Sequence, residues 1–177
     1  MRKIIILTIF LLSISLVSAI DLADYPEMFL VNVNDKIYFN AYIVIGDNAA
    51  ASDVIGSVDI ATSLNYDTGS LNPQHNAIEA ILASELRGRE FKHNIIAVGG
   101  PCINSVTAAI MGYPEHCADG FYRGKARIKL YENNGKIALI VAGFAGEDTR
   151  LAAKVLSNKL FPLKGDEVEV AGSSTKD

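Results

Sequence analysis

Residues 137–156 read IALIVAGFAGEDTRLAAKVL, and this stretch decides the fold class. Its first part is an uninterrupted apolar run that ends at Gly143 and predicts a strand. After residues 147–149, apolar residues recur at helical spacing and predict a helix; they are Leu151, Ala152, Val155 and Leu156. Because the strand is continuously apolar rather than alternating, we expect both of its faces to be buried. Such strands are typical of a parallel sheet between helical layers.

Two earlier segments repeat this order of strand, glycine and helix. Residues 42–45 lead to Gly46, and a helix is predicted to follow with Ser52 as its N-cap. The apolar residues expected on its buried face are Val54, Ile55, Val58, Ala61 and Leu64. Residues 94–98 lead to Gly99-Gly100, and either Asn104 or Ser105 then caps a helix. The apolar residues of that helix are Val106, Ala109 and Ile110. The three repeats predict a three-layer α/β domain with a mainly parallel sheet.

The remaining segments add an antiparallel part to the sheet. Residues 126–131 alternate in polarity, and Asn133-Asn134-Gly135 turns the chain into the strand described first, so a hairpin is predicted. The sheet should therefore be mixed. Residues 167–170 alternate Glu and Val like an exposed strand. Asn72-Pro73 is a helix-start signal, which favours a helix that continues to Leu86; a short strand in this region is the alternative.

The N-terminus has the features of a secretory signal peptide. Arg2 and Lys3 precede an apolar run over 4–17, and Val17-Ser18-Ala19 provides the small residues of a cleavage site. We therefore predict a signal peptide over 1–19, a single domain over 20–172 and a polar tail over 173–177. The alternative is an uncleaved N-terminal anchor, although the apolar run is shorter than the roughly 20 residues that span a bilayer. Contact with a membrane is expected only through such an uncleaved signal.

Composition narrows the classes of function. The 177 residues are 50% hydrophobic and 20% charged, which excludes a disordered or collagen-like protein. The formal net charge is −4, and it becomes more negative once Arg2 and Lys3 are removed. An acidic protein is repelled by phosphate backbones, so nucleic acid is not expected as a partner.

The only two cysteines, Cys102 and Cys117, are predicted to form a disulfide, because exported thiols more often pair than react. A catalytic pair of Cys102 and His116 is the less favoured alternative, since no third group is found that would orient the histidine. His75 and His93 have no second ligand at metal spacing, so zinc is not expected. No further cofactor is expected.

Polar and glycine residues follow the predicted strands, at the edge of an open α/β sheet where ligands usually bind. We predict that the ligand-facing residues are Asp47, Asn48, Gly99, Gly100 and Asp148. Asp47, Asp53, Glu147 and Asp148 raise the possibility of a Ca²⁺ site, but acidic residues at helix N-termini are the favoured interpretation. The glycines match no nucleotide-binding motif, so backbone packing is favoured as their role.

Three stretches, residues 41–56, 98–104 and 139–150, resemble the archaeal S-layer protein family and its small S-layer-like relatives. The resemblance runs in order from about Leu22 to Val170. It implies a secreted, non-enzymatic protein of the cell envelope or extracellular surface, with a structural or accessory role. The implied partners are S-layer or other envelope components, self-association included. The chain is shorter than full-length S-layer proteins, so a secreted module that binds a glycan or another small ligand at the strand-end loops is the alternative.

Overall fold

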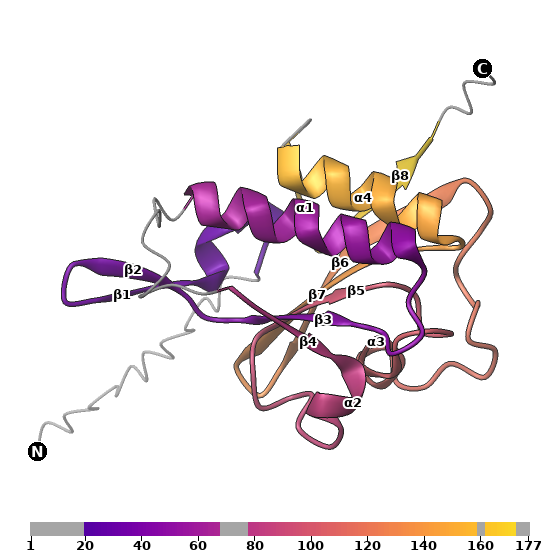
Figure 1. Cartoon of the computed structure of the whole chain (residues 1–177), viewed down its shortest axis with the longest axis horizontal. Helices are drawn as coiled ribbons and strands as arrows, with labels where there is room; N and C mark the ends of the chain where they lie inside the picture. The colour runs from indigo at the N-terminus through magenta and orange to yellow at the C-terminus, as the bar shows by residue number, and fades with distance from the viewer. Residues whose placement is uncertain (1–19, 68–77, 159–161, 173–177) are drawn as a thin grey trace, which may run out of the picture.

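The computed structural model describes residues 20–67, 78–158 and 162–172 (Figure 1). The predicted signal peptide, the Asn72-Pro73 helix start, His75 and the polar tail therefore lie outside the described residues. Within them, two short 3-10 helices, η1 (Leu22–Asp24) and η2 (Glu27–Phe29), precede the main sheet. They place Leu22 and Phe29 in the core.

The main sheet has six strands in the order β4-β3-β5-β7-β6-β8. Their bounds are β3 (Tyr42–Ile45), β4 (Glu79–Leu82), β5 (Ile95–Val98), β6 (Lys125–Asn133), β7 (Lys136–Gly143) and β8 (Glu167–Ala171). Strands β4, β3, β5 and β7 pair in parallel, whereas β6 pairs antiparallel with both β7 and β8. The prediction of a mainly parallel, mixed sheet is confirmed.

Helices cover both faces of this sheet, so the predicted three-layer α/β architecture is confirmed. Helices α1 (Ala51–Asp67) and α4 (Gly146–Asn158) lie side by side on one face (Figure 1). The shorter α2 (Ala83–Leu86) and α3 (Ser105–Ile110) cover the other. Strand β5 is completely buried, and its alternate side chains enter two separate cores. This is the burial on both faces that its uninterrupted apolar sequence predicts.

The hairpin of β6 and β7 is confirmed in its predicted place. Asn133 pairs with Lys136, and Asn134 and Gly135 form the two-residue turn with φ of 53° and 72°. Positive φ at both turn positions is what Asn-Gly supplies in a hairpin whose strands twist normally. Residues 167–170 are also a strand, as predicted, at the edge of the sheet beside β6.

The buried face predicted for α1 is wrong in its N-terminal half. Val54, Ile55 and Val58 are exposed, whereas Gly56 and Ile60 face inward. The helix carries apolar residues on two faces, so spacing alone did not decide between them. The face that contains Gly56 is the buried one, because a Cβ at Gly56 would lie 3.0 Å from the Cβ of Ala153 and its absence lets α1 and α4 pack closely. Ser52 is likewise not the N-cap, because the helix already begins at Ala51.

The long helix predicted through Leu86 is also wrong, and the alternative of a short strand is right for residues 79–82. These residues form β4, which pairs in parallel with β3 from Tyr42 opposite Glu79 to Ile45 opposite Leu82. Pairing with a buried neighbouring strand outweighs the local helical spacing, and only α2 remains helical.

A second, two-stranded sheet was not predicted. Strands β1 (Leu30–Val33) and β2 (Lys36–Phe39) form an antiparallel hairpin that extends from the body of the molecule (Figure 1). Asn34 and Asp35 make its turn with φ of 53° and 61°. The Asn34-Asp35 pair could have indicated this turn from the sequence, because Asn and Asp tolerate positive φ better than most residues.

Candidate functional site

The parallel strands β3, β5 and β7 end at one edge of the sheet, where α1, α3 and α4 begin. Two glycines allow the backbones to meet there. A Cβ at Gly46 would lie 2.1 Å from the carbonyl oxygen of Ile103, and one at Gly143 would lie 2.4 Å from the Cβ of Asp148. Both distances are far shorter than a van der Waals contact, so the packing role favoured for these glycines fits the structure.

Asn104 fixes this edge from inside the protein. The side chain is fully buried, and its amide group donates to the carbonyl oxygens of Val44 on β3 and Val98 on β5. Its Oδ1 accepts from the backbone N–H groups of Val106 and Thr107, which makes it the N-cap of α3. Of the two caps considered from sequence, Asn104 is therefore the one used.

Asp47 and Asn48, predicted to face a ligand, lie in the turn after β3. The Asp47 carboxylate accepts from the backbone N–H of Ser84 at 3.1 Å and from its hydroxyl group, so it ties this turn to α2. Asn48 is exposed. Neither residue lines the cavity described below.

Asp148 and Asp53 occupy the same position in two helices, the third residue after the N-cap. Asp148 Oδ2 accepts from the N–H of Ala145 at 3.1 Å, and Asp53 Oδ2 accepts from the N–H of Ala50 at 3.1 Å. Each carboxylate thus supplies an acceptor to the start of its own helix, as favoured from sequence. Asp148 also accepts from the N–H of Gly124 at 3.3 Å.

A cavity of about 120 Å³ lies between the starts of α1 and α4 and the loop after β5. Most of its lining is apolar: Pro101, Ile103, Phe121, Phe144 and the Cys102–Cys117 disulfide. Gly100 lines it as well, whereas Gly99 beside it is absent from the lining and turns the chain with φ of 102°. The polar side chains that line it are Asp53 and Thr149.

Asp53, considered from sequence for Ca²⁺ but favoured as a helix-start acid, is the charged residue of this lining. Its side chain is 1% exposed. Burial raises the pKa of Asp53, hydrogen bonds with the Thr149 side chain and the Ala50 N–H lower it, and the charge of Glu147 raises it again. The Thr149 hydroxyl itself accepts from Gly143 N–H and donates to the Ala145 carbonyl group.

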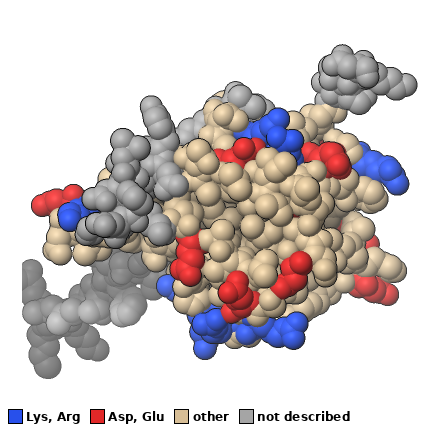
Figure 2. Space-filling model, viewed as in Figure 1, with Lys and Arg blue, Asp and Glu red and all other residues tan. Residues whose placement is uncertain are grey.

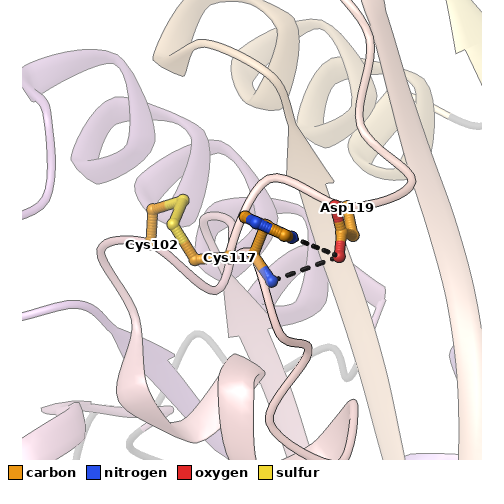
Figure 3. The surroundings of a disulfide bond; sticks show 4 residues. Cys102, Cys117 and Asp119 are labelled. Carbon is orange, nitrogen blue, oxygen red and sulfur yellow. Dashed lines mark hydrogen bonds and ion pairs between the residues drawn. A yellow bond between two sulfur atoms is a disulfide. The ribbon is translucent and has the colours of Figure 1, made fainter.

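The predicted disulfide between Cys102 and Cys117 is present (Figure 3). Both cysteines line the cavity. The disulfide joins the loop after β5 to the segment between α3 and β6. Cys102 is therefore not a free thiol. His116 lies outside the cavity lining, its side chain is 77% exposed, and its Nδ1 is 3.6 Å from Asp119 Oδ2. No catalytic pair of Cys102 and His116 exists in this arrangement.

Among the residues that the structure describes, no group of three or more His, Cys, Asp or Glu side chains is placed to hold a metal ion. The carboxylates considered for Ca²⁺ thus form no cluster there. None of the helices in the described ranges combines the length and apolarity needed to cross a membrane.

Comparison with known families decides the relationship. A family model described as "S-layer like family, outer domain" matches residues 64–160, more than half of the chain. The protein belongs to the S-layer like family. Its matched part runs from the end of α1 through α4 and contains the disulfide and most of the cavity wall. No curated protein matches the chain. Membership in the S-layer like family supports a structural role at the cell envelope.

Proposed function

We propose that this member of the S-layer like family is a secreted, non-enzymatic component of an archaeal cell envelope. It acts by associating with copies of itself and with other envelope components. The predicted signal peptide supports export, and family membership supports the envelope. We infer association from the exposed apolar residues on the outward face of α1.

That face is apolar where a surface helix is normally polar. Val54, Ile55 and Val58 are 41%, 42% and 56% exposed, and they lie next to one another on the helix. We call these three residues the α1 patch. Figure 2 shows charged side chains above and below a central band without charge, which α1 crosses in Figure 1. An apolar patch with a charged rim is typical of a protein–protein contact.

The side chains considered for covalent catalysis support the non-enzymatic part of the proposal. Cys102 is oxidised, and His116 contacts Asp119 at the surface rather than a nucleophile. Catalysis of that kind needs a nucleophile beside a base that is itself oriented. Polar groups at the strand ends then serve to hold the fold together or to bind, rather than to turn over a substrate.

The test measures association of the exported protein by analytical ultracentrifugation over a range of concentrations. We expect the native protein to associate as its concentration rises and Val58→Glu to weaken this association at least tenfold, because it places a charge in the α1 patch. Leu82→Glu is the matched control, since Leu82 is 46% exposed but lies on β4, outside the patch. Equal association of Val58→Glu and the native protein would refute the role of the patch.

Export and location need a separate measurement. The protein is isolated from the envelope fraction of its own cells, and its intact mass is determined. Residues 1–19 should be missing, and the protein should be enriched in the envelope. Recovery in the cytoplasm with the N-terminus retained would contradict the proposal.

A further inference from the structure

A second hollow, of about 210 Å³, lies at the opposite edge of the sheet from the cavity beside the disulfide. It is formed where four parallel strands begin. Glu79 is the first residue of β4, Tyr42 is the first of β3, Lys92 and His93 lie just before β5, and Lys136 is the first residue of β7. In contrast to the first cavity, this hollow is lined mainly by polar and charged side chains.

Hydrogen bonds fix the backbone around this hollow. The Asn94 amide group donates to the carbonyl oxygen of Asn40 at 3.0 Å, and its side-chain oxygen accepts from the N–H of Ile137 at 3.0 Å. The chain before β3 is thereby joined to β7. The His93 ring packs edge-on against Tyr42, with 5.0 Å between the ring centres. The lining residues therefore start from fixed positions, which lowers the entropy cost of binding a ligand.

The charged side chains of the hollow do not neutralise one another. Within the described ranges, Lys92, Lys136 and Glu79 take part in no ion pair. Strands β4 and β7 are three strand spacings apart, about 14 Å, which keeps Glu79 away from Lys136. By contrast, Lys125 and Lys129 on β6 each contact a glutamate of β8 at 2.7 Å. The hollow thus has a basic end and an acidic end, and both lack a counter-charge.

We propose that this hollow binds a hydroxylated carboxylate, which is the chemistry of a sugar acid. The carboxylate of the ligand lies between Lys92 and Lys136, and its hydroxyl groups lie toward Glu79 and Tyr42. The site goes beyond the proposed association and does not depend on it, because no residue of the α1 patch lines the hollow. It also lies at the amino ends of the strands, away from the ligand edge expected from the sequence.

The charges select this chemistry over other ligands. Two lysines at one end repel each other, and a negative charge between them removes that repulsion. Lys136 is half-buried, so salt screens this attraction less than it screens a surface pair. The Glu79 carboxylate accepts from hydroxyl groups but repels a second negative charge, which disfavours a phosphate dianion.

The volume of the hollow is sufficient for a sugar ring. An engineered cavity of about 150 Å³ binds benzene, so 210 Å³ with an open side admits a six-membered ring that carries polar substituents. A ring of this kind separates its carboxylate from its far hydroxyl groups. One ligand can therefore contact the basic and the acidic end of the hollow together.

The test titrates the exported protein with glucuronate at low salt and follows backbone amide signals by NMR. We expect shifts at His93, Asn94 and Lys136, which line the hollow. Glucose lacks the carboxylate and acetate lacks the hydroxyl groups, so each should bind at least tenfold more weakly. Absence of glucuronate binding, or equal affinity for glucuronate and either of these two probes, would overturn the proposal.

Three variants test the position of the carboxylate. Lys92→Gln and Lys136→Gln should each weaken glucuronate binding about tenfold, because each loses a charge-assisted hydrogen bond. Lys154→Gln is the matched control and should bind as the native protein does, since it removes the same charge from an exposed position of α4 outside the hollow. Native affinity in both Lys92→Gln and Lys136→Gln would place the ligand elsewhere and overturn the proposal.

The same chemistry is carried by a free sugar acid and by an acidic polysaccharide. Methyl glucuronide has its anomeric hydroxyl group blocked, as a sugar acid does inside a polysaccharide chain. It should bind as tightly as glucuronate if the site receives a polysaccharide, and at least tenfold more weakly if the site receives a free sugar acid. The peptide Glu-Glu-Glu tests the carboxylates of another protein. If this peptide binds as tightly as glucuronate, hydroxyl groups are not recognised and the proposal is overturned.

Discussion

Replacing Asn104 should cost more stability than any other polar substitution at the strand ends. Its amide and carbonyl groups make four hydrogen bonds at 3.0 to 3.3 Å, two to strand carbonyls and two from the first turn of α3. In Asn104→Ala all four partners lose their bond inside the protein. At about 1 kcal/mol each, the free energy of unfolding should fall by about 4 kcal/mol. For a domain of this size that lowers Tm by roughly 10 °C.

The assay is urea unfolding followed by circular dichroism, because the chain has no tryptophan. Ser105→Ala is the control at the same helix end; Ser105 is exposed and should change stability by less than about 0.5 kcal/mol. Asn104→Asp keeps the acceptors for α3 but points a carboxylate at the carbonyl oxygens of Val44 and Val98. It should be destabilised at neutral pH and recover as the carboxylate is protonated. A loss below about 1 kcal/mol in Asn104→Ala would refute the reasoning.

Three further predictions concern the same edge of the sheet. Gly46→Ala should lower the free energy of unfolding by about 1–3 kcal/mol, because its Cβ would lie 2.1 Å from a backbone oxygen. Gly100→Ala should lose far less, since its nearest contact would be at 3.4 Å. Equal urea midpoints for the two variants would contradict this. Replacing both Cys102 and Cys117 by serine opens a loop of 15 residues and should lower the free energy of unfolding in urea by about 3 kcal/mol. Coincident unfolding curves for the variant and the native protein would exclude a stabilising cross-link. The raised pKa of Asp53 means that its contribution to stability is full below its unfolded value near 3.8 and is lost as pH rises through the folded pKa. Asp53→Asn should therefore gain stability relative to the native protein as pH rises, and a constant difference across pH 3 to 8 would show that the carboxyl group titrates normally.

The sequence predicts those parts of the fold in which local and tertiary preferences agree. The strand, glycine and helix order around Gly143 is one case, because a strand buried on both faces needs an uninterrupted apolar run. The Asn134-Gly135 turn is another, since its positive φ angles are set by the two residues themselves. The disulfide also followed from sequence, because only two cysteines are present.

The parts that could not be predicted depend on contacts between distant residues. Residues 79–82 become a strand because β3 lies beside them, which their own spacing does not reveal. Asp53 was considered both for Ca²⁺ and as a helix-start acid, and its carboxylate accepts from the Ala50 N–H at the start of α1. Its near-complete burial depends on α4, whose Thr149 hydrogen-bonds to it, and nothing near Asp53 in the sequence indicates that contact.

The N-terminal half of α1 buries small or polar residues and exposes larger apolar ones, which is the reverse of the usual arrangement in a surface helix. Small or polar residues, Gly56 and Ser57, face inward against α4, while the larger apolar side chains of Val54, Ile55 and Val58 face solvent. Gly56 allows close approach of the two helices, but it contributes no apolar side chain to the core. These side chains are 41–56% exposed, so burial of the exposed part by a partner would add roughly 1 kcal/mol each. The pattern therefore favours a helix that packs closely enough to be held by its neighbour while its outward face remains available to a second molecule.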